Sequence, residues 1–135
     1  MILFTDTTSD QTIIALFCKK DFVKIDEIKF ESKGMQSELL IFSIDKLLKK
    51  HAISKQDIEI IMAVPGPGSY TGLRIGLATL NSMAFALNIP IVGVESPGGK
   101  KEIISAFSQI KGSIFDCPVL PKYKYPPKIT QSTRT

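Results

Sequence analysis

Three segments at the start of the chain have the pattern of apolar and polar positions that β-strands show. Residues 2–5 (ILFT) and 12–17 (TIIALF) are rich in apolar and β-branched side chains, and the polar stretch DTTSD separates them. Residues 22–30 (FVKIDEIKF) alternate apolar with charged side chains, which is typical of a strand with one face in water at the edge of a sheet. The apolar positions there are Val23, Ile25 and Ile28. The pattern predicts an antiparallel three-stranded meander with these positions on the dry face.

Helical and strand patterns alternate in the second part of the chain. In residues 37–51 the apolar positions recur every three or four residues, which predicts an amphipathic helix. Residues 58–64 (IEIIMAV) are nearly all apolar, as in a central strand covered on both faces. Residues 71–87 form a second predicted helix, ended by the tripeptide Asn-Ile-Pro, and residues 91–94 (IVGV) a further buried strand. Residues 101–110 predict a short third helix.

This order of elements predicts the fold class. The predicted class is an α/β protein with a single actin-like (ASKHA, ribonuclease-H-like) domain. Helical crossovers join the later strands to the sheet, so these strands should lie parallel to the first strand in a five-stranded mixed sheet. A length of 135 residues suits one domain. We expect the actin-like domain over residues 1–96, a short helical linker over 97–118 and an extended, proline-rich tail over 119–135.

The helix predicted over residues 71–87 has two apolar sides. One side is expected to face the core: Leu73, Leu77, Leu80, Ala84 and Leu87. The opposite side is also apolar or small: Ile75, Ala78, Ser82, Phe85 and Ala86. A helix that is apolar all round is normally buried all round, and a domain of this size has few elements to cover both sides. We therefore expect the second side to bind another protein. A smaller apolar patch at Leu39 and Phe42 should do the same. The alternative is that other residues of this chain cover the second side.

The loop PGPGSYTGLRIG, at residues 65–76, precedes this helix and contains the glycines that phosphate-binding loops use. A Walker-type loop places lysine directly after its last glycine, whereas Leu73 follows Gly72 here. The dinucleotide pattern also fails, because a threonine occupies the position of its third glycine. An anion could still bind at the helix start and the turn after the first strand, through Asp6, Thr7, Thr8, Gly66, Gly68, Ser69, Thr71 and Gly72. The alternative is a stiff turn in which Ser69 or Thr71 caps the helix.

The titratable residues argue against an independent enzyme. His51 is the only histidine, and Cys18 and Cys117 have no metal-binding or redox spacing, so no zinc site or serine–histidine relay is expected. Asp6 lacks the further carboxylates that a ribonuclease-H-type magnesium site needs. The net charge of +4 is spread along the chain, which favours solvated faces over a nucleic-acid groove. The sequence therefore predicts a protein without catalytic or metal-binding residues. Because it has no basic leader and no apolar stretch of ~20 residues, it also predicts a cytoplasmic protein without membrane contact.

Three stretches of the sequence resemble a known family. FTDTTSD at the start, MQSELL with the helix that follows, and above all GPGSYTGLRIGLATLNSMAFALNIPIVGVES are similar to TsaB, once called YeaZ, a subunit of the bacterial machinery for tRNA threonylcarbamoyladenosine synthesis. The string GPGS-aromatic-TGLRIG is close to a signature of that family. The resemblance covers residues 1–96, and VLPKYKYPPKIT at residues 119–130 resembles the proline-rich tail of the same family.

The resemblance implies a function. TsaB has the actin-like fold but is catalytically degenerate, and it docks its two N-terminal helices on TsaD, which holds metal and modifies adenosine 37 of ANN-reading tRNAs. An ATPase, TsaE, joins the pair. This implies a heterodimer with TsaD, possible TsaE contact, self-association in the absence of TsaD, only indirect tRNA contact, and no cofactor in this subunit, since ATP and metal belong to the partner subunits. The residues assigned to partner binding are Gln36, Leu39, Phe42, Arg74, Ile75, Ala78, Ser82 and Phe85.

The sequence departs from the family pattern in two places. The family usually has histidine at the position of Gln36, which weakens any chemical role there. We expect the usual second domain to be almost wholly absent, since residues 97–118 lead directly into the tail, and the resemblance then does not carry over contacts made through that domain. The alternative function is a small actin-like nucleotide-binding protein that uses the Asp6 turn and the loop at residues 66–72.

Overall fold

The computed structural model describes residues 1–32, 37–68, 70–95 and 99–123. In chain order the elements are β1 (Ile2–Asp6), β2 (Gln11–Phe17), β3 (Lys24–Glu31), α1 (Ser37–Lys50), the 3-10 turn η1 (Lys55–Asp57), β4 (Ile60–Ala63), α2 (Tyr70–Leu87), β5 (Ile91–Gly93) and α3 (Lys100–Phe107). This is the predicted order, with small differences at the ends of elements. The predicted α/β fold is confirmed.

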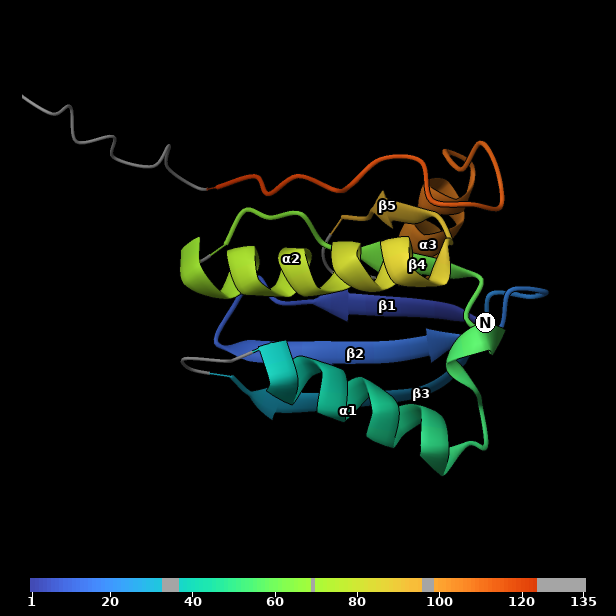
Figure 1. The fold of residues 1–135 in the computed structure, drawn as a ribbon, viewed down its shortest axis with the longest axis horizontal. Helices are drawn as coiled ribbons and strands as arrows, with labels where there is room; N and C mark the ends of the chain where they lie inside the picture. The colour runs from blue at the N-terminus through green and yellow to red at the C-terminus, as the bar shows by residue number, and fades with distance from the viewer. Residues whose placement is uncertain (33–36, 69, 96–98, 124–135) are drawn as a thin grey trace, which may run out of the picture.

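The strands form one mixed sheet in the order β3-β2-β1-β4-β5 (Figure 1). β2 is antiparallel to both β1 and β3, because short turns connect these strands, and Ile2 of β1 faces Phe17 of β2. β4 lies parallel to β1 and β5 lies parallel to β4, because a helix precedes each of them. All four residues of β4 are buried, which confirms the prediction of a central strand covered on both faces.

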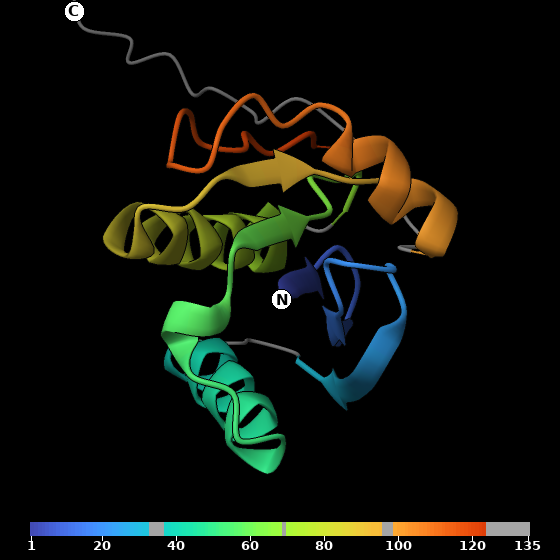
Figure 2. The ribbon, with the colours of Figure 1, turned by 90° about the vertical axis from the view of Figure 1, so that its right-hand side faces the viewer.

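Helices cover the sheet unequally on its two faces. α1 and α2 pack side by side on one face, and α3 covers part of the other (Figure 2). The larger core cluster lies under α1 and α2 and includes Leu3, Ile14, Leu16, Leu40, Ile44, Leu47, Ile61, Leu73, Leu77, Leu80 and Ala84. The smaller cluster lies under α3 and includes Ile2, Phe4, Phe17, Ile60, Met62, Ile103 and Ala106. In the part of the chain that the structure describes, no helix has the length and apolar character to cross a bilayer.

The predicted orientation of the first apolar side chains in β3 is wrong. Val23 and Ile25 are 51% and 37% exposed, whereas Ile28 and Phe30 pack against the larger core cluster. The pairing of β2 with β3 shifts between Leu16 and Phe17, which adds one residue to β3 at this point. Ile25 is the added residue and has no partner in β2, and Val23 precedes β3, so strand pairing holds neither side chain against the core. The prediction that this strand lies at the sheet edge is confirmed.

One ion cluster fastens the C-terminal end of α1 to β3. The Oδ2 atom of Asp26 lies 2.8 Å from Nε2 of His51 and 2.9 Å from Nζ of Lys50, and both nitrogens donate to the carboxylate. The backbone N–H of Glu27 donates to Oδ1 at 2.8 Å. These hydrogen bonds, first of all that from His51, hold the pKa of Asp26 well below its ordinary value of 3.8.

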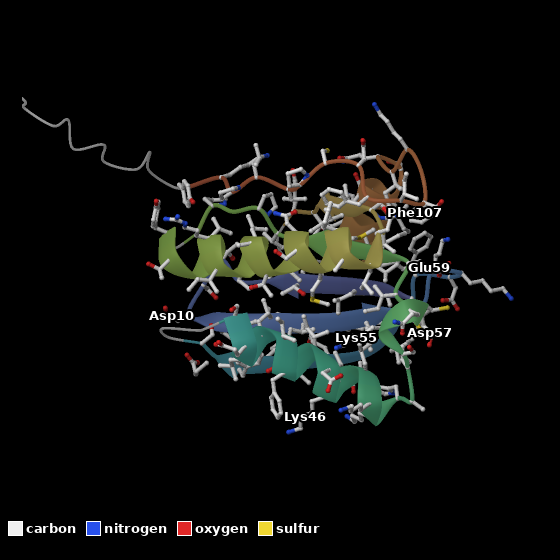
Figure 3. The ribbon with its side chains drawn as sticks, viewed as in Figure 1. Asp10, Lys46, Lys55, Asp57, Glu59 and Phe107 are labelled. Atoms are coloured by element: carbon white, nitrogen blue, oxygen red, sulfur yellow. The ribbon has the colours of Figure 1, made fainter. Side chains whose placement is uncertain are left out.

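Replacing Asp26 by asparagine is expected to lower stability at neutral pH and to make stability less sensitive to acid. Because the folded-state pKa of Asp26 lies below the unfolded value, its contribution is present above that value and is lost as the pH falls through the folded-state pKa. Urea unfolding of both proteins between pH 7 and pH 3 measures this, and the difference should shrink at low pH. Asp10→Asn, in the turn between β1 and β2 (Figure 3), is the control. A difference that stays constant with pH would contradict this account.

Candidate functional site

The turn after β1 lies against the start of α2, as the predicted anion site requires, but its carboxylate is already used. Oδ1 of Asp6 accepts hydrogen bonds from the backbone N–H of Thr8 at 2.9 Å and from its hydroxyl at 2.6 Å. Asp6 and Thr7 are buried, and Thr8 is half-buried. The side chain of Asp6 therefore organises its own turn, an arrangement common for aspartate at the start of a turn.

Close packing accounts for two of the conspicuous glycines. Gly66 has φ +128°, a backbone conformation that favours glycine, and a Cβ atom there would overlap the carbonyl of Lys122. At Gly76, a Cβ atom would overlap the side chain of Thr7, so this glycine allows α2 to approach the turn. The loop thus connects three parts of the fold: the turn after β1, α2 and the C-terminal segment.

The remaining residues of the predicted anion site lie around the start of α2. Gly68 contacts the backbone of Thr8. α2 begins at Tyr70, so Thr71 lies within the first turn and is not the N-cap that the sequence suggested as one option; it is exposed, and Gly72 is half-buried. Ser69, the other predicted cap, lies outside the described residues. The structure therefore brings these residues together without showing that they bind an anion.

Titratable side chains do not gather into a metal site in residues 1–32, 37–68, 70–95 and 99–123. No group of three or more histidine, cysteine, aspartate or glutamate side chains there could hold an ion. Cys18 is half-buried and Cys117 is exposed, both as free thiols. His51 contacts Asp26 and belongs to the cluster at the end of α1.

The predicted second side of α2 is open to solvent. Leu73, Leu77, Leu80 and Ala84 face the core, and on the other side Arg74, Ala78, Ser82 and Phe85 are exposed, with Ile75 half-buried. We call these last five residues the α2 face. Phe85 is 72% exposed even though the ring of Phe115 contacts it edge-on, with ring centroids 5.6 Å apart. The hydroxyl of Ser82 donates to the carbonyl of Ala78 within the helix, at 2.8 Å. The α2 face is thus a largely apolar surface that also carries Arg74, and the hydroxyl of Ser82 is hydrogen-bonded within the helix.

The structure places Leu39 and Phe42 beside the sheet edge. They are 41% and 64% exposed and line a groove of about 610 Å³ together with Ile28 and Phe30 of β3. Lys46, which projects from α1 into solvent (Figure 3), borders the same groove. These two α1 residues therefore lie on the flank of α1 toward β3. Gln36 lies outside the described residues.

Sequence reasoning missed Ile41, which is 41% exposed on α1. Two residues along a helix correspond to a rotation of about 200°, so Ile41 lies on the flank of α1 opposite to Leu39. Since Leu39 borders β3, the side chain of Ile41 is turned toward the side of α1 where α2 packs. A helical projection of residues 37–50 could have found it, because Ile41 is apolar and lies outside the core stripe of Leu40, Ile44, Leu47 and Leu48.

The chain matches a known family and several curated proteins. Residues 34–106 match the family model described as "TsaD: tRNA N6-adenosine threonylcarbamoyltransferase". The chain is 32% identical over 96 residues to the tRNA threonylcarbamoyladenosine biosynthesis protein TsaB of Bacillus subtilis (strain 168), which covers 71% of this chain and 42% of that protein. It is 34% identical over 91 residues to the TsaB protein of Buchnera aphidicola subsp. Baizongia pistaciae, covering 67% of this chain and 40% of that protein.

A solved structure shows the same fold. YeaZ from Pseudomonas aeruginosa superimposes with a TM-score of 0.62 at 23% sequence identity, covering 70% of this chain and 43% of that chain. A second Pseudomonas aeruginosa structure, titled as a protein with similarity to peptidase YEAZ, has a TM-score of 0.63 at 23% identity, covering 70% of this chain and 42% of that chain. The chain therefore spans less than half the length of these relatives.

Proposed function

The chain belongs to the TsaB/YeaZ family, and from this premise we propose that it acts in tRNA threonylcarbamoyladenosine biosynthesis as a non-catalytic scaffold that docks on a TsaD protein. TsaD would carry the metal and transfer the threonylcarbamoyl group to tRNA. We place this role in the cytoplasm. Contacts with TsaE and self-association stay predictions.

The observation that carries the proposal is the open α2 face. Ala78 and Ser82 are small and exposed, so the backbone of a second helix can approach closely there. Phe85, at 72% exposure, is a large aromatic side chain of the kind that anchors protein interfaces. The family model that matches residues 34–106 also spans both helices, so a TsaD partner shares this architecture. Two related helix pairs of this kind can pack face to face, as the resemblance implies.

The buried turn at Asp6 supports a scaffold role. A carboxylate that accepts two hydrogen bonds from Thr8 inside its own turn is poorly placed to hold a nucleotide-bound metal ion. On this interpretation, the glycines of the loop serve packing against the turn and the C-terminal segment. The proposed activity is therefore binding, and chemistry belongs to the partner.

Co-purification tests the proposal. The tagged chain is co-expressed with the TsaD protein encoded in the same genome, and a 1:1 complex is expected in size-exclusion chromatography with light scattering. The threonylcarbamoyladenosine content of tRNA, measured by mass spectrometry, should fall when the gene for this chain is deleted and recover on complementation. Absence of a complex would overturn the proposal. Calorimetry with magnesium-ATP on the isolated chain then tests the nucleotide alternative, which requires a Kd below about 10 μM.

A further inference from the structure

The C-terminal segment lies along α2 as an extended strap. We use this name for residues 115–123, which run antiparallel to α2 along its whole length (Figure 1). The strap contacts Asn88 through Phe115, Asn81 through Val119, and Tyr70 through Tyr123. Val119 and Tyr123 also pack against the larger core cluster. The strap therefore belongs to the folded domain.

Asn81 holds the strap by its backbone. Its Nδ2 donates to the carbonyl of Val119 at 2.9 Å, and its Oδ1 accepts from the N–H of the same residue at 2.9 Å. This pair of hydrogen bonds satisfies both backbone groups of one residue, as a neighbouring strand would. Two single hydrogen bonds flank it: Phe115 N–H to Oδ1 of Asn88 at 3.3 Å, and Lys122 N–H to the carbonyl of Pro65 at 2.6 Å.

The spacing of the α2 residues matches the length of the strap. Tyr70 and Asn81 are 11 residues apart, which returns to the same side of the helix within about 20°, and Asn88 follows the last helical residue with a φ of 52°. Helix from Tyr70 to Asn88 measures about 27 Å, and an extended chain from Phe115 to Tyr123 measures about 26 Å. Tyr70 and Asn81 on α2, and Asn88 directly after it, thus meet the strap at its two ends and its middle.

The contacts between α2 and the strap border the α2 face. Phe85 of that face meets Phe115 of the strap edge-on, with planes at 89°. At the other end of α2, the exposed ring of Tyr70 stacks on Tyr123, with centroids 4.6 Å apart. Aromatic contacts therefore join the strap to α2 near both ends of the helix, and Phe115 extends the apolar surface beyond Phe85.

We propose that the strap forms part of the surface that docks on TsaD, with Asn81 and Asn88 as positioning residues that hold Phe115 against Phe85. The inference rests on the proposed function. Fixed in this way, Phe85 has one preferred orientation, and the partner does not have to order it on binding. We call the hydrogen bonds of Asn81 and Asn88 to the strap the clamp. Without the clamp, the strap loses its fixed position, and Phe115 no longer holds Phe85 in one orientation before the partner binds.

Two variants remove the clamp at different points. Asn81→Leu keeps a side chain of similar size and removes both hydrogen bonds to Val119. Asn88→Gly removes the acceptor for Phe115, and glycine tolerates the φ of 52° that Asn88 adopts. Ala52→Gly is the matched control, since Ala52 follows α1 with nearly the same φ, 53°.

Hydrogen exchange and TsaD binding are measured on the same proteins. Both clamp variants should exchange the strap amides at least about tenfold faster while the amides of β1 and β4 stay protected, and both should bind TsaD about tenfold or more weakly. Ala52→Gly should match the wild type. Faster strap exchange with unchanged TsaD affinity would overturn the inference. Unchanged exchange in both clamp variants would also overturn it. Neither result would contradict the proposed function. A wild type that does not bind TsaD would overturn both.

Discussion

Arginine at both Ala78 and Ser82 is expected to abolish co-purification with TsaD, lowering the affinity by about 100-fold or more. The two side chains lie next to one another on the α2 face, one turn apart. In the free protein both arginines would extend into water, and because together with Arg74 they form two like-charged i,i+4 pairs, the expected loss of stability is about 1 kcal/mol or less. In a complex they would be buried without partners in a closely packed helix interface, which is costly for a charged group.

Pull-down, isothermal titration calorimetry and thermal unfolding of the double variant test this expectation. The control is Ser105→Arg with Ser108→Arg, which adds the same charge to exposed positions at α3 on the other face of the sheet. This control should bind TsaD with the affinity of the wild type. A loss of affinity in the Ala78 and Ser82 variant then comes from the position of the arginines and not from the added charge. Retained binding by the Ala78 and Ser82 variant would contradict the docking proposal. Unfolding of this variant would mean that the α2 face is core.

A substitution on the opposite side of α2 gives the comparison for stability. Leu73 is fully buried under the helix, and replacing it by alanine should cost about 2–5 kcal/mol through lost burial and the cavity left behind. The contrast between Leu73 and Ala78, five residues apart, measures directly which side of the helix the domain uses for its own core.

Alanine at Gly76 is expected to destabilise the domain by about 1–3 kcal/mol, against the preference of the helix itself. Helix propensity alone predicts that glycine to alanine stabilises by up to about 1 kcal/mol. The new methyl group, however, would overlap the Oγ1, Cβ and Cγ2 atoms of Thr7, which is 2% exposed. Thr7 cannot move freely, because the hydrogen bonds between Asp6 and Thr8 fix its turn.

Chemical denaturation of the single variants and of the Thr7→Ala, Gly76→Ala double variant measures this packing. Removing the hydroxyl and methyl of Thr7 takes away two of the three overlapping atoms, so the double variant should be more stable than the sum of the single effects predicts. A stabilised Gly76→Ala protein would show that α2 can shift away from the turn, and would contradict the packing explanation for this glycine.

Much of the fold could be predicted because it follows from local periodicity. The stripe of Leu73, Leu77, Leu80 and Ala84 and the apolar run of β4 each identify an element and its buried side without knowledge of any neighbour. The exposed side of α2 could be predicted for the same reason. These residues repeat with the period of one element, and that element buries one side at most against a single sheet.

Other features depended on contacts between distant segments. The shift in pairing at Leu16 and Phe17 left Ile25 without a partner in β2, and the sequence of β3 does not show where such a shift occurs. The place of Leu39 and Phe42 depended on which neighbour each flank of α1 meets. The strap is the clearest case, since the bond between Asn81 and Val119 joins residues 38 positions apart and an asparagine in a helix carries no local sign of its partner.

The sequence by itself therefore determined the elements, their order, the central strand, and the existence of an uncovered apolar side on α2. These follow from side-chain periodicity, which acts within each element. Only the tertiary structure decided the faces of the edge strand, the packing that requires Gly66 and Gly76, and the strap that continues the α2 face. These features depend on which chain segments are in contact in the folded protein, and the free energy of a contact depends on the residues of both segments.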